Sequence, residues 1–449
     1  MTPPDPAVLK SRPASQLLPV LKIPEFLVFA VSQAVSLFGD KLDYMALLAL
    51  IAYFAQRFAW ESARAISYLS VIVALPTVLF GPLAGILVDR WDRRKVMIVC
   101  DSSRTLLVLS IPTLALATNN LVLIYAIAFL VFLFGLFFNT CRLSIIPDLV
   151  GGERLLGANS FMSFIGRIAT FLGMFLGGLI VDWSGWLKLG IRPVWSAGFY
   201  IDSFSYFVSV VALLVIFLRW SKVGRGQRFV PSKGQEVKIF LDQQSRMIHE
   251  VREAWRLVTR EPAVLFVYSS IMLMVLIGAA VFVLYIPIIQ SEKSLTGLGL
   301  GTKGVGYVAA IGSIGLVLSS MAYGLIGHRI RKHKVMLCAF LVLGLVGASL
   351  ALIRSFVWVA PLAFIAGLAL SPITIGMDTL LHEAVPETAR GRIFSTREWL
   401  MHLAFAVAAL VIGQLTNLFQ VRTLLLAASV LVVVTTLVGF GLTRRWQIA

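Results

Sequence analysis

The sequence predicts an all-α integral membrane protein whose twelve transmembrane helices form two pseudo-symmetric six-helix bundles. Three observations predict this fold class. Hydrophobic residues make up 59% of the 449 residues and the mean hydropathy is +0.90, which leaves too little polar material to cover a water-soluble domain. Apolar runs of about 20 residues, the length at which a helix crosses a bilayer, recur along the chain. Finally, several landmarks in the first half of the chain return in the second half at one constant spacing.

Each apolar run is assigned to one helix, because the short alternating segments of a membrane β-barrel are absent. The runs divide six and six around a polar segment at 219–262, so we expect bundles at 24–218 and 263–443 and flexible cytoplasmic tails at 1–23 and 444–449. The twelve predicted helices lie at about 24–54, 65–88, 96–117, 121–141, 156–182, 198–218, 263–290, 303–326, 335–353, 358–380, 395–416 and 423–443.

The polar segment at 219–262 is predicted to be a cytoplasmic loop. Its second part, RMIHEVREAWRLVTR at 246–260, places apolar side chains on one helical face and mostly Arg and Glu on the remainder. Such a helix is expected to lie along the membrane surface as an interfacial linker. The apolar residues of this face are Met247, Ile248, Val251, Trp255 and Val258.

The net charge of +17 is explained by orientation in a membrane. If the amino terminus is cytoplasmic, the cytoplasmic loops and tails hold 27 Lys and Arg residues, and the opposite face holds eight. This bias is the positive-inside pattern, which predicts that both termini are cytoplasmic. Basic residues next to spans face anionic lipid, so membrane lipids are the expected partner and a nucleic acid is not.

The two halves of the chain look like a duplication. Gly85 follows the second run and Gly324 follows the eighth, 239 residues later. Pro147 and Pro386, after the fourth and tenth runs, are separated by the same 239 residues. Repeated halves around a cavity at the centre of the membrane are typical of alternating-access carriers.

Charges inside a span are costly in lipid, so each needs a partner, a water-filled cavity or a function. Asp40 lies near the middle of the first run, and Asp43 and Tyr44 lie three and four residues later on the same helical face. A carboxylate in this position can exchange a proton during transport, so Asp40 is predicted to be the proton or cation site. Substrate is expected to bind near the centre of the membrane between the two halves, among Asp40, Tyr44, Arg167 and apolar walls. The alternative for Asp40 is a fixed ion pair with Lys41 or with Arg167 of the fifth helix.

The other polar residues within or near the predicted spans are expected to have different roles. Asp101 and Arg104, three residues apart, are expected to form a local ion pair. Arg142 is either a gate or a topology determinant. Asp202 is expected to be a polar helix contact or a cavity wall. Polar residues of the tenth and eleventh helices are expected at the cytoplasmic mouth: Asp378, Arg397 and Glu398.

Enzyme, channel and metal-binding classes find no support in the sequence. It contains no Walker loop, nucleophile elbow or zinc motif, so neither direct ATP use nor a cofactor is expected, and the energy source would be a proton gradient. His382 and His402 have no second His or Cys at ligand spacing, which predicts no metal site.

The connection GILVDRWDRRK at 85–95 resembles the signature that follows the second helix in the major facilitator superfamily. The resemblance implies that its acid and bases latch the two halves together on the cytoplasmic side, with the acid near the start of the eleventh helix, around Arg392. The bases could then bridge to Asp148 or Glu387. The matching residues, which with Arg142, Arg392 and Glu398 make up the predicted cytoplasmic gate, are Gly85, Asp89, Arg90, Arg93 and Arg94.

Three further segments, GMFLGG at 173–178, DSFSYF at 202–207 and VPETARGRIFS at 385–395, are similar to the branch that contains enterobactin exporters and macrolide-efflux carriers. The resemblance implies a proton-coupled antiporter of a prokaryotic plasma (inner) membrane that exports an amphipathic small molecule, drug or siderophore-like, as a functional monomer. Two alternatives stay open. One is a lysophospholipid or other lipid carrier of the same superfamily, and the other is a non-transporting membrane scaffold or sensor.

Overall fold

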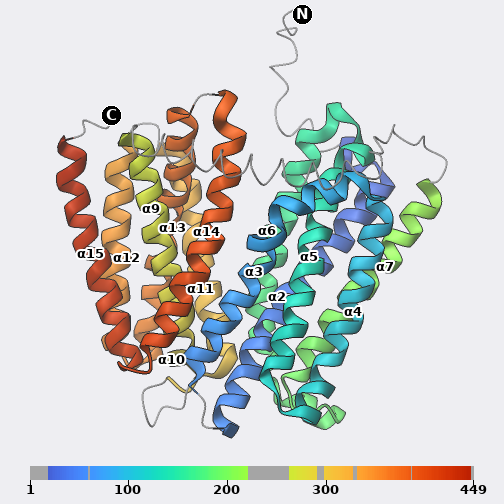
Figure 1. Ribbon diagram of the computed structural model, residues 1–449, viewed down its shortest axis with the longest axis horizontal. Helices are drawn as coiled ribbons and strands as arrows, with labels where there is room; N and C mark the ends of the chain where they lie inside the picture. Colours follow the sequence, from blue (N-terminus) through green and yellow to red (C-terminus); the bar gives the residue numbers. More distant parts are fainter. Residues whose placement is uncertain are drawn as a thin grey trace, which may run out of the picture. The chain divides into compact units, whose positions relative to one another are not determined.

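The computed structural model describes residues 19–58, 61–220, 262–290, 298–326, 331–385 and 387–445 (Figure 1). Every regular element in these ranges is a helix, as predicted. The predicted amphipathic segment at 246–260 and most of both predicted tails lie outside the described residues.

The helices follow the predicted apolar runs. The first six are α2 (Pro24–Phe58), α3 (Ser62–Arg90), α4 (Arg93–Thr118), α5 (Leu121–Val150), α6 (Leu155–Val181) and α7 (Ser196–Trp220), with short 3₁₀ turns η2 (Gly152–Arg154) and η3 (Ser184–Leu189). The later ones are α9 (Pro262–Ala280), the π-helical turn η4 (Val281–Tyr285), α10 (Ile286–Gln290), α11 (Gly301–Ile326), α12 (Lys332–Leu352), α13 (Phe356–Ala384), α14 (Glu387–Leu415) and α15 (Val421–Arg445).

Among the described residues, eleven helical spans are long and apolar enough to cross a membrane, and α9, η4 and α10 together make one of them, Val264–Gln290. The helix α2 is not among the eleven. Its 35 residues, at about 1.5 Å each, are nevertheless longer than a bilayer requires. It carries Asp40, Lys41 and Asp43 in its middle, which lowers its mean hydropathy and places charge at the depth of the hydrocarbon. We interpret α2 as the twelfth span.

Local sequence explains how adjacent spans begin and end. Asp92 precedes α4 with extended backbone, and its carboxylate accepts a hydrogen bond from the Arg94 backbone N–H. At the other end of α4, Asn119 adopts a left-handed conformation with φ of 49°, which stops the helix. Asn120 then caps α5 by accepting from the Val122 N–H at 2.9 Å. Two consecutive asparagines therefore make the tight turn between α4 and α5.

The described residues form two compact units. One consists of those up to Ala46 and those from Phe80 to Trp220, and the other of those within Leu47–Leu79 and those from Pro262 onward. The end of α2 and the beginning of α3 thus pack with the later helices: the Gln290 side-chain amide donates to the Leu48 carbonyl oxygen at 3.4 Å. This grouping of contacts does not test the predicted division into bundles at 24–218 and 263–443, which stays a prediction.

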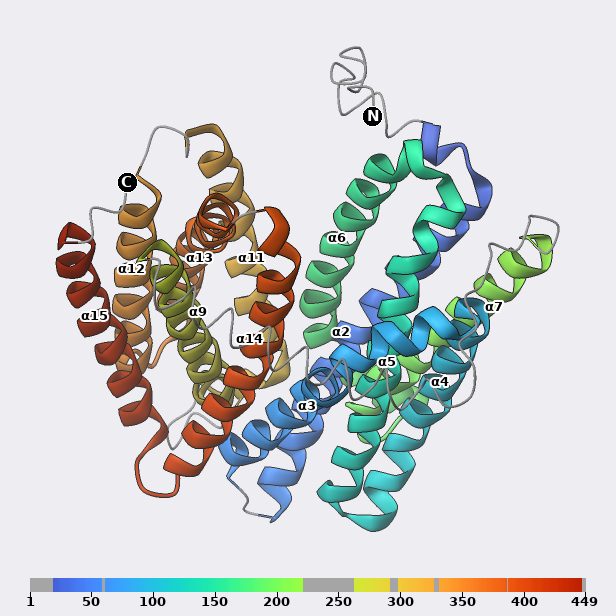
Figure 2. The same ribbon diagram turned by 45° about the horizontal axis from the view of Figure 1, so that its top comes forward.

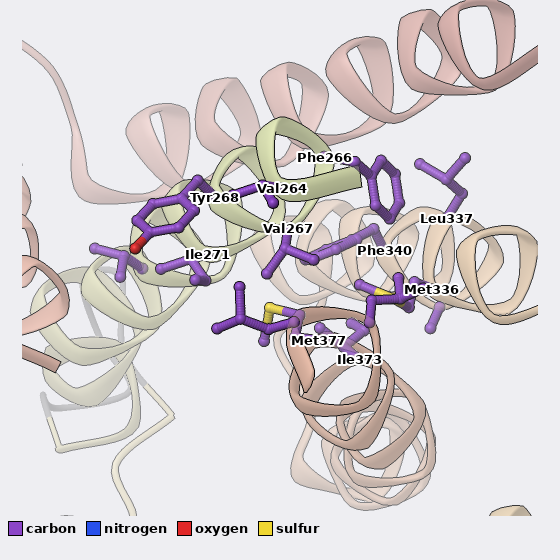
Figure 3. Packing of buried hydrophobic residues seen from close by; sticks show 14 of the residues in the cluster. Val264, Phe266, Val267, Tyr268, Ile271, Met336, Leu337, Phe340, Ile373 and Met377 are labelled. Carbon is purple, nitrogen blue, oxygen red and sulfur yellow. The ribbon is translucent and has the colours of Figure 1, made fainter. Parts of the chain in front are cut away.

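Each unit has its own apolar core. In the first unit, buried side chains of α2, α4, α5, α6 and α7 pack around Phe26, Phe29 and Phe138. In the second unit, α9, α12 and α13 meet around Phe340 and Met377 (Figure 3). In this unit α15 contacts both α12 and α9, and α12 and α15 lie side by side in both ribbon views (Figure 2).

Small residues allow close helix contacts inside the first unit. A Cβ atom at Gly173 would lie 2.7 Å from the Phe38 carbonyl oxygen and 2.8 Å from Lys41 Cβ. A Cβ atom at Gly177 would lie 3.3 Å from Leu42 Cα. These two glycines, four residues apart, form a stripe on α6 along which α2 approaches closely.

Gly367→Ala is expected to lower the stability of the second unit. A Cβ atom at Gly367 of α13 would overlap the carbonyl oxygen of Gly312 on α11, so the two helices would have to separate. Overpacking of this kind costs about 1–3 kcal/mol. The midpoint of thermal unfolding in detergent measures the effect. Gly441→Ala is the matched control, because a Cβ atom there meets nothing within 4 Å, and an equal midpoint for both variants would contradict the expectation.

Candidate functional site

A cluster of charged side chains lies inside the first unit, centred on Arg104 of α4. Its guanidinium donates to Asp101 Oδ1 at 3.2 Å, one turn earlier on the same helix. It also forms an ion pair with Asp40 of α2 and donates to the Tyr206 hydroxyl of α7. One arginine therefore joins three helices at the depth where α2 carries its charges.

Tyr206 completes the network around Asp40. Its hydroxyl donates to Asp40 Oδ1, the same oxygen that Arg104 contacts. The guanidinium carbon of Arg104 lies 3.9 Å from the centre of the Tyr206 ring, a distance at which a cation and an aromatic face attract. The Arg104 side chain is 7% exposed and that of Asp40 is 25% exposed, so the network reaches the surface of the unit at Asp40.

The close approach of α7 to α2 depends on a glycine. A Cβ atom at Gly39 would overlap Ser205 Oγ and Asp202 Oδ1, so only glycine permits this contact. A second tie joins α7 to α4, where the Ser203 hydroxyl donates to the Thr105 carbonyl oxygen at 2.9 Å. These contacts bring polar side chains of α2, α4 and α7 to one place.

Two further carboxyl groups are buried in this cluster. Asp43 is 3% exposed and Asp202 is 0% exposed. The Ser205 hydroxyl donates to Asp202 Oδ1 at 3.1 Å. Asp202 Oδ2 and Asp43 Oδ1 receive no hydrogen bond from the described residues.

The charges of the cluster do not balance. Arg142 of α5 is close enough to interact electrostatically with Asp40 and Arg104, and its Nε has no hydrogen-bond partner among the described residues. Two arginines thus face four carboxyl groups, and ionised carboxylates without partners are very costly in a dry interior. The arrangement can hold protons, and it can exchange an ion-pair partner where Asp40 is exposed.

The structure changes the predicted partners of Asp40. The alternative to a proton site, a fixed ion pair of Asp40 with Lys41 or Arg167, named the wrong cations: the partner is Arg104. Arg167 is an exposed residue of α6. Helix geometry explains the difference, because Lys41 follows Asp40 directly and points about 100° away from it, toward Gly173 of α6. Arg104 has both its expected contact with Asp101 and this cross-helix contact. Tyr44 lies one turn beyond Asp40 on the same helix and is half-buried.

Asp378 lies in the second unit and belongs to a different contact. It forms an ion pair with Arg397 of α14 at 2.5 Å, while its own side chain is half exposed. Tyr268 of α9 is close enough to Arg397 to interact with it electrostatically. Glu398, next along α14, is exposed. Each unit therefore carries an arginine–aspartate pair that joins two helices.

One of the contacts predicted for the basic residues after α3 is present in the structure. Arg93 Nη1 donates to the Ser144 carbonyl oxygen at 3.1 Å and lies 3.8 Å from Asp148 Oδ2, which is one of the two predicted bridges. The Arg94 guanidinium lies over the Phe217 ring of α7 at 5.5 Å. A Cβ atom at Gly85 would meet nothing within 4 Å. The side chains of three predicted gate residues, Asp89, Arg90 and Arg392, lie outside the described part of the structure.

Sequence reasoning missed Tyr206, Ser205 and Gly39 as members of the cluster. The signal for Tyr206 was available, because Asp202 and Tyr206 are four residues apart in DSFSYF and must share one face of α7. No pattern in the sequence tells which other helix this face meets. Gly39 precedes Asp40 directly, and its role becomes visible only once α7 is in place.

An apolar groove runs along the first unit between α2 and α6. Its volume is about 350 Å³, within the range of small-molecule pockets. Phe38 lines it, and Asp40, two residues on, points to the opposite side of α2 because each residue turns the helix by about 100°. The groove is therefore separate from the charge cluster. Its lining residues are Val31, Ala34, Val35, Phe38, Phe161, Ile165, Ile168, Ala169 and Leu172.

Comparison with known proteins gives the family. The sequence profile described as Major Facilitator Superfamily matches residues 30–305 and 293–446, nearly the whole chain. The chain belongs to the Major Facilitator Superfamily. It is therefore a multi-pass membrane transporter, and it is not an enzyme.

Relatives within the superfamily are distant in sequence. The multidrug efflux pump Tap of Mycolicibacterium fortuitum is 24% identical over 376 residues, which cover 82% of this chain and 84% of Tap. The uncharacterized MFS-type transporter YfiS of Bacillus subtilis (strain 168) is 25% identical over 376 residues, covering 81% of this chain and 80% of YfiS.

Solved structures of other transporters share the fold. The peptide transporter POT in complex with alafosfalin has a TM-score of 0.69 at 13% identity, covering 97% of this chain and 99% of POT. A bacterial homologue of the human lysosomal transporter Spinster has a TM-score of 0.66 at 14% identity, covering 94% of this chain and 98% of that protein. At these identities the likeness establishes the Major Facilitator fold alone.

Proposed function

We propose that this transporter exports amphipathic small molecules, drug or siderophore-like, in exchange for protons by alternating access. It would act as a monomer in the plasma membrane of a prokaryote, with both termini in the cytoplasm. The observation that carries the proposal is the buried cluster of Arg104 with Asp40, Asp101 and Tyr206, which reaches the surface of its unit at Asp40. The distant relationship to the multidrug efflux pump Tap supports export as the direction.

The cluster supports coupling because Asp40 can exist in two states. As a carboxylate it attracts Arg104 and accepts from the Tyr206 hydroxyl. A proton on Asp40 would remove the negative charge and weaken the ion pair that joins α2 to α4. Because Arg104 also contacts α7, the charge state of the Asp40 carboxylate would affect the contacts among α2, α4 and α7. Protonation of Asp40 would therefore favour one packing arrangement of α2, α4 and α7 over another.

The predicted latch is part of the same proposal. The basic residues after α3 would hold the cytoplasmic ends of the helices when that side is closed, and the Arg93 contacts with α5 support this role. In the second unit, the ion pair of Arg397 with the half-exposed Asp378 supports a role at the mouth or in substrate contact.

Asp40→Asn is expected to abolish substrate accumulation driven by a pH gradient. The amide keeps the size of the side chain but carries no charge, so it can neither change its charge state with pH nor attract Arg104 as strongly. The measurement is uptake of a panel of amphipathic drugs and siderophores into proteoliposomes with an imposed pH gradient. Glu153→Gln is the matched control, because Glu153 is an exposed carboxylate of η2 outside the cluster. Equal gradient-driven flux in wild type and Asp40→Asn would exclude Asp40 as the coupling site.

A lipid carrier is the second candidate, and the apolar groove between α2 and α6 favours it. The nine groove residues present almost purely hydrocarbon surface, which suits an acyl chain. A protonophore separates the two candidates. Export coupled to protons should stop when the gradient collapses, whereas lipid moving down its own gradient should continue.

A further inference from the structure

We propose that Asp43 of α2 and Asp202 of α7 hold one proton between them, and that this is the proton exchanged for substrate. The inference rests on the proposed function and deepens it, because it separates the group that stores the proton from the ion pair of Asp40 with Arg104.

The two carboxyl groups are neighbours across the α2–α7 contact. The Asp202 carboxyl lies against the backbone of α2 at Gly39, where a Cβ atom would overlap Asp202 Oδ1. Gly39 and Asp43 are four residues apart, so Asp43 projects from the same face of α2 one turn further along. The Asp43 and Asp202 carboxyl groups are accordingly close enough to interact electrostatically.

Among the described residues, neither carboxyl group forms an ion pair or a hydrogen bond with a cation, although both lie within electrostatic reach of Arg104. Arg104 directs its hydrogen bonds to Asp40, Asp101 and Tyr206. Arg142 of α5 interacts electrostatically with Asp40. The other group on α7 that contacts the pair is the Ser205 hydroxyl, which donates to Asp202 Oδ1 and carries no charge.

Burial then decides the charge state. Two ionised carboxylates side by side, at 3% and 0% exposure and sharing Arg104 with Asp40 and Asp101, would repel each other in a medium that solvates them poorly. A single proton shared between them removes one charge and supplies a donor for an oxygen of the partner. Asp43 Oδ1 and Asp202 Oδ2, which receive no hydrogen bond from the described residues, are the oxygens available for it.

The pair and Asp40 thus have different tasks. The Asp40 side chain is 25% exposed, so cargo or solvent can reach its carboxylate and compete with Arg104 for it. The Asp43–Asp202 pair has no solvent contact in this conformation, so its proton can leave only after α2 and α7 shift. One proton would leave the pair toward the cytoplasm and one would return from the other side in each cycle, while one substrate moves outward. No bond other than O–H forms or breaks.

The proton can be observed directly by infrared spectroscopy, without any transport assay. Purified wild-type protein at neutral pH should show the carboxyl C=O stretching band of a protonated acid that shifts in D₂O. The double variant Asp43→Asn/Asp202→Asn should lose this band, and each single variant should shift it because the remaining carboxyl group loses its partner. Asp40→Asn and the exposed control Glu153→Gln should leave the band unchanged. Elution of each variant as a single symmetric species in size-exclusion chromatography shows that it is folded.

Transport measurements test the second half of the proposal. Asp43→Asn and Asp202→Asn should still exchange labelled for unlabelled substrate but should lose accumulation driven by a pH gradient. Absence of the protonated band in wild type, an unshifted band in both single variants, or its persistence in the double variant would overturn the shared proton. Normal gradient-driven accumulation in either variant would overturn its role in coupling. If wild-type transport does not respond to the pH gradient, the proposed function is wrong. The infrared band would still decide whether the Asp43–Asp202 pair holds a proton.

Discussion

Arg104→Ala should unfold the first unit at a lower temperature than any other single truncation in the cluster, and should abolish transport. The substitution leaves Asp40 and Asp101 without their cation and removes the donor to the Tyr206 hydroxyl. Breaking a buried pair from one side costs about 3–5 kcal/mol, because the remaining charge stays buried. Thermal unfolding in detergent and flux in proteoliposomes measure the two effects.

Two further variants separate charge from geometry at this position. Arg104→Lys keeps the charge, but one ammonium group cannot reach partners on three helices with the spread of a guanidinium, so partial stability and poor transport are expected. Arg104→Met combined with Asp40→Asn removes both charges, which should recover part of the stability and none of the coupling. Lys188→Ala, at an exposed position of η3, is the control. Wild-type stability and flux in Arg104→Ala would show that the cluster is dispensable.

Gly413→Val should stop transport by separating α3 from α14. In the second unit, a Cβ atom at Gly413 would overlap Cβ and Oγ of Ser67, so a valine requires the helices to move apart by about 1.5 Å to reach normal contact. Neighbouring hydrogen bonds would be lost with this contact. They are Gln414 Nε2 to the Tyr68 hydroxyl at 3.1 Å and Trp399 Nε1 to the Val78 carbonyl oxygen at 3.0 Å.

The effect matters for function because α3 continues without a break from this contact into the first unit. Under the proposed alternating access, this contact would tie the beginning of α3 to α14. A reporter cysteine in place of Ser70, which is 1% exposed, should react faster with a thiol reagent in Gly413→Val than in the parent lacking native cysteines. Gly441→Val, in open space on α15, is the control. Unchanged labelling together with normal flux would contradict the proposed role of this contact.

The sequence predicted the helices well and their contacts poorly. Runs of about 20 apolar residues identified every span, including α2, because lipid demands both a helix and an apolar surface. The pairing of Asp101 with Arg104 was predictable from a spacing of three residues, since both lie on one helix. The pairing of Asp40 with Arg104 was not predictable, because 64 residues separate them and several basic residues could have met Asp40.

By itself the sequence determined the helical membrane class, the approximate positions of the described spans and the polar residues inside the first one, because these follow from periodicity, length and the cost of charge in lipid. The tertiary structure alone decided which charges meet: that Arg104 binds Asp40, that Tyr206 completes the network, and that Asp43 and Asp202 are buried in the same unit. The physical reason is that contacts between helices depend on where small residues such as Gly39 and Gly173 allow close approach. A local pattern records that a glycine is present, but not which helix packs against it.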